Sequence, residues 1–65
     1  MQVILNGEAC ETRAATVLEL LTEQGADPAR VAVVLNDAVL PAAGRAAVRL
    51  AAGDRVELLA FAGGG

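Results

Sequence analysis

The sequence predicts an α+β fold in which a single main helix packs on one mixed sheet of four or five strands. Short apolar runs, each bounded by turn residues, recur along the chain, and one segment alone has the spacing of a helix. The chain has 65 residues, which suffice for one small domain. One helix on one sheet is a two-layer solution in which each element buries its apolar face against the other.

The first two strands form a predicted hairpin. Residues 2–5 are a short apolar run that includes β-branched side chains, which is typical of a strand. Asn6-Gly7 follows and favours a type I′ turn, because both central positions of that turn need positive φ. Residues 8–12 should then return antiparallel, and we expect Cys10 and Thr12 to face the core.

The helix is predicted by its start signal, its periodicity and its stop signal. Thr16 and Glu19 match a capping box, in which the Thr hydroxyl accepts from the Glu amide and the Glu carboxylate reaches back. A mostly apolar face follows at helical spacing and comprises Val17, Leu20, Leu21 and Gln24. Gly25 can adopt the left-handed conformation that ends a helix. Asp27-Pro28 then prevents further helix.

A second hairpin follows the helix. Residues 31–36 are a nearly continuous apolar run, which predicts a central and well-buried strand. Asn36-Asp37 marks a turn, after which Val39-Leu40 can pair back until Pro41 ends the pairing. Residues 42–47 are rich in Ala and predict a loop or one irregular helical turn.

The last strand is predicted over residues 55–61, after a turn at Gly53-Asp54. It can share a sheet with the first hairpin only if it lies beside the first strand. We expect a right-handed crossover through the helix to bring the strand at 31–36 parallel to the first. This order of elements is the β-grasp arrangement, as in ubiquitin. The prediction is a β-grasp domain over 1–61 and a flexible tail over 62–65.

Composition and charge exclude several classes of function. The formal net charge is −3, whereas nucleic-acid binding needs clustered positive charge. We predict no membrane segment, because no apolar run approaches the ~18–20 residues that span a bilayer. Residues 1–6 lack the features of a signal peptide, so we expect a cytoplasmic protein. Cys10 is the only cysteine and His is absent, which predicts a small core residue rather than a disulfide or a metal site.

The sequence closes with Ala62-Gly63-Gly64-Gly65 and contains no His, Lys, Trp or Tyr. Glycine has no Cβ, so Gly63 and Gly64 are predicted to thread into the active sites of partner proteins. Extended, residues 62–65 reach about 13–14 Å. We predict that Gly65 supplies the reactive group, its α-carboxylate. That group is ionised at neutral pH and a poor electrophile, so an external nucleotide-using enzyme would have to activate it. A frayed end without function is the alternative.

Side chains alternate across the last strand, which places Arg55, Glu57, Leu59 and Phe61 on one face. The charged members of this set predict that the face lies in water. Leu59 and Phe61 would then be exposed apolar residues immediately before the tail. They are the predicted docking patch for a partner; the alternative is that loops or sheet twist cover them.

Four segments resemble the thiamine-pathway sulfur carrier family, ThiS, and the similarity runs over the whole chain. They are Asn6-Gly7-Glu8, residues 16–21 (TVLELL), residues 33–41 (VVLNDAVLP) and residues 53–58 (GDRVEL). Two features depart from the family pattern: the stretch after Pro41 is rich in Ala, and three glycines rather than two close the sequence.

The resemblance implies a carrier that is not itself an enzyme and binds no cofactor or metal. A ubiquitin-activating-like adenylyltransferase of the ThiF type would use ATP to adenylate Gly65. A cysteine desulfurase or other sulfur donor would supply the sulfur of a thiocarboxylate, and thiazole synthase of the ThiG type would receive it. Three alternatives stay open at this point: the small sulfur-carrying subunit of molybdopterin synthase, which usually has a longer chain; a ubiquitin-like protein modifier; and a plain interaction domain.

Overall fold

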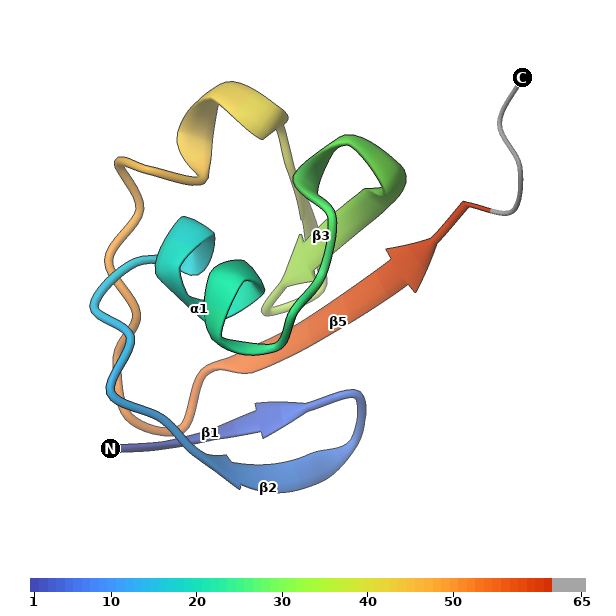
Figure 1. Cartoon of the computed structure of the whole chain (residues 1–65). Coiled ribbons are helices and arrows are strands. Elements are labelled where there is room, and N and C mark those ends of the chain that lie inside the picture. Colours follow the sequence, from blue (N-terminus) through green and yellow to red (C-terminus); the bar gives the residue numbers. More distant parts are fainter. Residues whose placement is uncertain (62–65) are drawn as a thin grey trace.

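One helix lies across one face of a five-stranded sheet (Figure 1). The computed structural model describes residues 1–61, so the predicted boundary of the tail and the predicted roles of Gly63, Gly64 and Gly65 lie outside the described residues. The strands are β1 (Gln2–Leu5), β2 (Glu8–Glu11), β3 (Val31–Leu35), β4 (Ala38–Leu40) and β5 (Arg55–Ala60). The helix α1 spans Val17–Glu23, and two short 3₁₀ helices, η1 (Pro28–Arg30) and η2 (Ala42–Gly44), lie in the connections.

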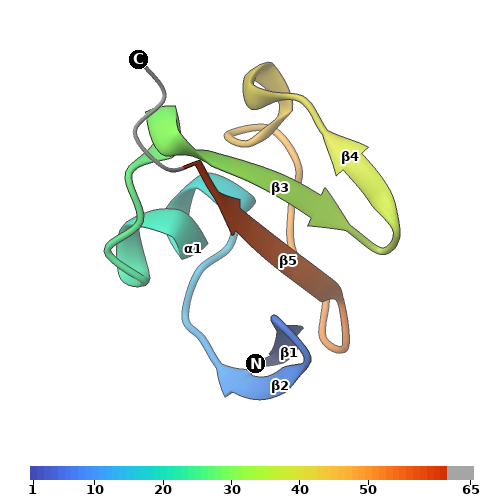
Figure 2. The same ribbon diagram turned by 90° about the vertical axis from the view of Figure 1, so that its right-hand side faces the viewer.

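The strand order is β2-β1-β5-β3-β4, which confirms the predicted β-grasp fold. Figure 2 shows β5 between the β1–β2 hairpin and the β3–β4 hairpin. The middle position belongs to β5, while β3 pairs on both sides and is an inner strand, as predicted. The last strand takes this position because it pairs with both hairpins and so joins the two halves of the sheet.

The predicted parallel pairing of the strand at 31–36 with the first strand is wrong. β5 runs parallel to β1 and antiparallel to β3, so β3 runs antiparallel to β1. The helix connects β2, not β1, to β3, and β2 is antiparallel to β1. β2 and β3 therefore run parallel to each other, and β1 and β5 lie between them in the sheet.

Both predicted hairpin turns are present, and their central residues are left-handed, as predicted for Asn6-Gly7. Asn6 and Gly7 have φ values of 50° and 84°, and Asn36 and Asp37 have values of 49° and 71°. The second turn places two non-glycine residues in this region, which costs energy that local contacts must offset. The Asn36 side chain supplies such contacts. Its Oδ1 accepts from the Arg55 amide at 2.9 Å, and its Nδ2 donates to Oδ1 of Asp54 at 3.1 Å.

The helix begins and ends where the sequence predicts. The Thr16 hydroxyl accepts from the Glu19 amide at 3.2 Å, while the Glu19 carboxylate accepts from the amide of Ala15 at 2.7 Å, one residue before the cap. At the other end Gly25 has a φ of 71°. The Gly25 amide donates to the carbonyl of Thr22 at 3.0 Å and the Ala26 amide to that of Leu21 at 2.9 Å, which together form a Schellman motif.

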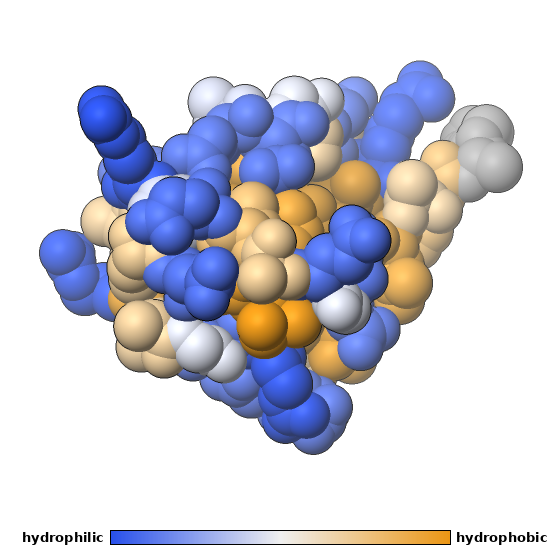
Figure 3. All heavy atoms as spheres, turned by 90° about the horizontal axis from the view of Figure 1, so that it is seen from below, coloured by the Kyte–Doolittle hydropathy of each residue, from blue (hydrophilic) through white to orange (hydrophobic). Residues whose placement is uncertain are grey.

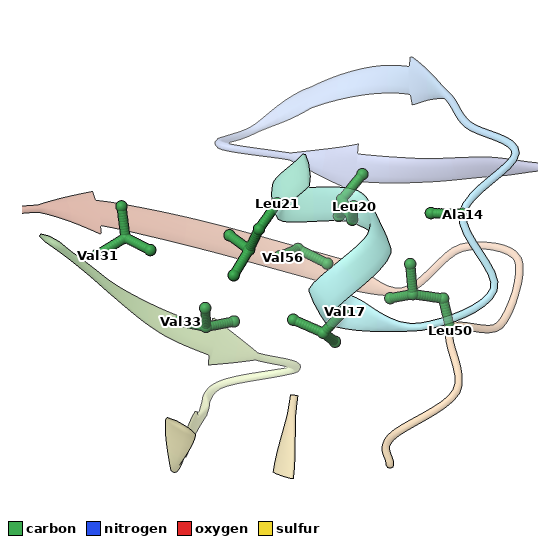
Figure 4. Close-up of a cluster of buried hydrophobic side chains, with 8 residues drawn as sticks. All are labelled: Ala14, Val17, Leu20, Leu21, Val31, Val33, Leu50 and Val56. Atoms are coloured by element: carbon green, nitrogen blue, oxygen red, sulfur yellow. The ribbon is translucent and has the colours of Figure 1, made fainter. Parts of the chain in front are cut away.

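The core lies between α1 and the sheet (Figure 4). Its buried members are Ala14, Val17, Leu20, Leu21, Val31, Val33, Leu50 and Val56. Gln24, the fourth residue of the predicted helix face, is exposed because it follows the last turn of α1. Thr12 is buried as predicted, and Cys10 is half-buried, with its sulfur 3.8 Å from Nε2 of Gln24.

Over residues 1–61, no helix is long and apolar enough to cross a membrane. Within the same range, no group of three or more His, Cys, Asp and Glu side chains is arranged to hold a metal ion.

Candidate functional site

Strand β5 ends at Ala60, one residue before the last described residue, Phe61. It pairs with β3 along five residue pairs, from Val31 opposite Ala60 to Leu35 opposite Val56. It pairs with β1 only at its beginning, where Ile4 and Leu5 lie opposite Arg55 and Val56. The second half of β5 therefore extends past β1, as Figure 1 shows, and carries the following residues away from the hairpin.

Two hydrogen bonds fix this projecting part of β5. The Leu58 amide donates to Oδ1 of Asn6 at 2.8 Å, so the first turn holds the strand where β1 no longer reaches it. The Phe61 amide donates to the carbonyl of Arg30 at 2.8 Å, one residue beyond the end of β5. The backbone is thus anchored as far as Phe61, immediately before the glycine-rich residues of the sequence.

Leu59 and Phe61 are exposed, as the sequence predicts. Their exposed fractions are 51% and 55%. Both lie on the face of β5 opposite the core, because Val56 of the alternate set is buried against α1. Their exposure makes them available to a partner, and their docking role stays a prediction.

The exposed pair belongs to a wider apolar area that crosses three strands. Leu59 lies opposite Ala32 of β3, and Val34 of β3 lies opposite Val39 of β4. Directly opposite residues share one face of a sheet, and Val39 is 76% exposed. We call these five residues, Ala32, Val34, Val39, Leu59 and Phe61, the outer apolar surface. Figure 3, a view of the molecule from below, shows apolar atoms exposed among charged ones on the surface.

Charged side chains border the outer apolar surface. Arg55 pairs with Asp37 at 2.7 Å, and Arg30 lies 3.6 Å from Asp27, all four side chains being largely exposed. Glu57 lies between Arg55 and Leu59 on the same face of β5 and is exposed. Exposed ion pairs contribute little to stability, so these charges are better suited to orienting a partner than to holding the fold.

Three features of the structure were missed from the sequence. Val39 was assigned to a strand but not to the patch, although its pairing with the strand at 31–36 could have indicated it. The prediction of a well-buried strand at 31–36 holds for Val31 and Val33, whereas Ala32 and Val34 are only partly buried because α1 covers the other face. The burial of Arg45 was also missed, since its Ala-rich surroundings carry no periodic signal.

The described part of the site offers a surface and a strand end rather than a set of reacting side chains. The sequence contains no His or Lys, the side chains that most often serve as bases or nucleophiles near neutral pH. Cys10 lies on β2, on the side of β1 away from β5. The geometry is suited to recognition by another protein, and the reactive role of Gly65 stays a prediction.

Comparison with known proteins agrees with this geometry. The ThiS family profile matches residues 3–65. A crystal structure of a thiamine biosynthesis protein (ThiS) from Geobacter metallireducens superimposes with a TM-score of 0.83 and 36% identity, with 100% of both chains covered. A solution structure of a thiamine biosynthesis protein from the same organism gives a TM-score of 0.80 at 36% identity and covers 100% of this chain and 88% of that one.

A longer protein is also similar in sequence. A thiazole synthase of Paramagnetospirillum magneticum is 39% identical over 66 residues, which cover 100% of this chain. The chain spans only 20% of the length of that relative. The match of the family profile to nearly every residue, together with the shared β-grasp fold, shows that this chain belongs to the ThiS family.

Proposed function

We propose that this protein is a sulfur carrier of thiamine biosynthesis and that the α-carboxylate of Gly65 is its reactive group. In this cycle a partner enzyme adenylates Gly65, a sulfur donor converts it to a thiocarboxylate, and a thiazole synthase receives the sulfur. The protein acts as a co-substrate in the cytoplasm and binds no cofactor of its own, because ATP is used by the adenylating partner.

The observation that carries this proposal is the way β5 ends. The strand is anchored through Phe61 and presents Leu59 and Phe61 to solvent. The sequence then continues as Ala62-Gly63-Gly64-Gly65, which contains no side chain larger than a methyl group. A partner that grips the outer apolar surface would therefore receive a narrow chain in a fixed direction, and Gly63 and Gly64 would pass through its cleft.

The covalent steps balance without any side chain of this protein. The carboxylate of Gly65 attacks the α-phosphorus of ATP, which forms an acyl adenylate and releases pyrophosphate. A sulfur nucleophile at the oxidation level of sulfide then attacks the acyl carbon and expels AMP. One carboxylate oxygen leaves with AMP and one sulfur takes its place, with no net change of oxidation state.

The longer relative supports the choice of a thiazole synthase as the receiving partner. In the thiazole synthase of P. magneticum, a segment similar to this entire chain occupies a fifth of the polypeptide. Two modules on one polypeptide meet at a high effective concentration, which is useful when one acts on the other. We extend this relationship to the present chain, with a separate synthase of the same class as its partner.

Loading of the carrier can be followed by intact mass. The purified protein is incubated with ATP, a ThiF-type adenylating enzyme and sulfide, and its mass should rise by about 16 Da as oxygen is replaced by sulfur. Deleting Gly64 and Gly65 should abolish the gain while circular dichroism stays that of the folded domain. Gly53→Asn, which changes a distant turn and keeps the tail, is the matched control and should load. A gain of mass in the deletion variant would refute the assignment of the tail.

The same spectrometry on protein isolated from its own cells should give the mass of a chain that ends at Gly65 or at its thiocarboxylate. A longer mature chain would contradict the proposal. Complementation of a thiamine auxotroph, compared with complementation of a molybdopterin-deficient strain, then separates the thiazole pathway from the molybdopterin pathway.

A further inference from the structure

Arg45 is a buried cation that the proposed function does not use. It follows η2 in the Ala-rich connection, and only 7% of its surface is exposed. Its guanidinium reaches across to the segment at 28–31, where Nη1 donates to the carbonyl of Pro28 and Nη2 to that of Val31, each at 2.6 Å. Within residues 1–61, its Nε is buried without a hydrogen-bond partner, and none of the ion pairs involves it.

This arrangement is expensive in free energy. A buried guanidinium loses its hydration, and an unpaired buried donor adds a further penalty. An apolar side chain of similar length would fill the same space without either cost. Global stability therefore does not account for the guanidinium, and its two hydrogen bonds point to a geometrical role.

The segment that Arg45 holds is also the last anchor of β5. Arg30 lies between Pro28 and Val31 in the sequence, and its carbonyl accepts from the amide of Phe61 at 2.8 Å. Phe61 thus holds this segment through the carbonyl of Arg30, and Arg45 holds it through the carbonyls of Pro28 and Val31. β4 pairs with β3 only at Val33–Leu35 and does not reach Val31, so the guanidinium takes the place of a strand there.

We propose that Arg45 is a positioning residue that fixes the backbone at Phe61, the last described residue before Ala62-Gly63-Gly64-Gly65 in the sequence. Its two hydrogen bonds immobilise residues 28–31, and these residues in turn hold Phe61 through a single hydrogen bond. The inference rests on the proposed function in one respect, namely that the positioned tail carries the reacting carboxyl group. Without Arg45 the domain stays folded, but the hydrogen bond from the Phe61 amide to the Arg30 carbonyl opens.

Amide hydrogen exchange tests the geometrical half of this proposal. In Arg45→Met the Phe61 amide should exchange at least about fivefold faster relative to the Asn36 amide, the scale of one net hydrogen bond. The Asn36 amide is the internal reference, because it donates to the Arg55 carbonyl at 2.8 Å at the other end of the β3–β5 ladder. Arg49→Met removes an exposed arginine nearby and should leave the ratio unchanged.

Arg45→Lys provides a second folded variant, because a lysine keeps the charge and the stem but lacks the planar fork that reaches two carbonyls. It should raise the exchange ratio without unfolding the domain. Equal acceleration of the Phe61 and Asn36 amides, in either variant, would indicate general destabilisation and overturn the proposal.

The loading reaction tests the functional half. Arg45→Met should change the KM for the carrier little, because the other four residues of the outer apolar surface stay in place, and should lower kcat by at least about tenfold, as expected for a misplaced reacting group. Wild-type kcat in a variant with a loosened Phe61 amide would overturn the positioning role. If the wild-type protein gains no mass, the proposed function fails, and the exchange ratio still decides whether Arg45 fixes the strand end.

Discussion

Replacing Leu59 by Asp should weaken the binding of the adenylating partner more than it weakens folding. A fully buried Leu side chain contributes about 1.5–3 kcal/mol relative to an exposed one. Since Leu59 is 51% exposed in the free domain, docking can bury the other half and gain about 1 kcal/mol. The Asp carboxylate would also lose hydration in an apolar interface. Together these two terms should cost at least about 2 kcal/mol of binding free energy, which corresponds to a rise in Kd of roughly 30-fold.

The cost to folding is smaller, because the outer face of β5 is already half in water. The variant loses the buried half of the Leu side chain and some strand propensity, together about 1–2 kcal/mol. A domain of 65 residues has a stability of about 3–10 kcal/mol, so most of the variant should remain folded at 25 °C. The free energy of unfolding in urea measures this term separately.

Calorimetric titration of the adenylating enzyme with each carrier variant measures the binding term. Ala52→Asp is the matched control, since it adds the same charge at an exposed position in the turn before β5, at the end of the strand opposite the tail. The control should bind like the wild type. A Kd for Leu59→Asp within about twofold of the wild-type value, well below the estimate from area burial, would eliminate the outer apolar surface as the docking site.

Two further predictions concern the contacts that hold the scaffold. Thr12→Val should lower the free energy of unfolding by about 2–3 kcal/mol, because the buried hydroxyl donates to Glu23 at 2.5 Å and accepts from the Ala14 amide at 3.0 Å. Thermal denaturation should show a fall in Tm of about 10–20 °C, whereas the exposed Thr22→Val should change little; equal shifts would argue against the buried network. Gly25→Ala should cost about 1–2 kcal/mol through its φ of 71° alone, since an added Cβ meets no atom within 4 Å. Gly25→Asn, which tolerates this conformation better, should cost less in the same urea titration, and equal losses would contradict the backbone explanation.

The local elements could be predicted because each depends on a few neighbouring residues. Asn6-Gly7 fixes its turn through two φ angles, and Thr16 begins the helix through one hydrogen bond to a residue three positions on. Gly25 ends the helix because it adopts positive φ without strain. The exposure of Leu59 and Phe61 followed from alternation along one strand, for which the charged positions indicated the solvent side.

The mutual arrangement of the strands was harder to predict because it is decided by contacts between distant segments. The parallel pairing of β1 with β5 joins residues about fifty positions apart, and the rule for crossovers was applied to β1 although the helix follows β2. The extension of the outer apolar surface to Val39 depends on a three-residue strand with little pattern of its own. Neither feature has a signal within a short window of sequence.

The sequence by itself determined where this chain turns, where its helix begins and ends, and which end carries the glycines, since bond rotation, capping and side-chain size act over a few residues. The tertiary structure decided the central place of β5, the joining of apolar residues from three strands into one surface, and the burial of Arg45 against carbonyls fourteen and seventeen positions away in sequence. These depend on which segments share the limited space around a single helix, and that competition is settled only when the whole domain has folded.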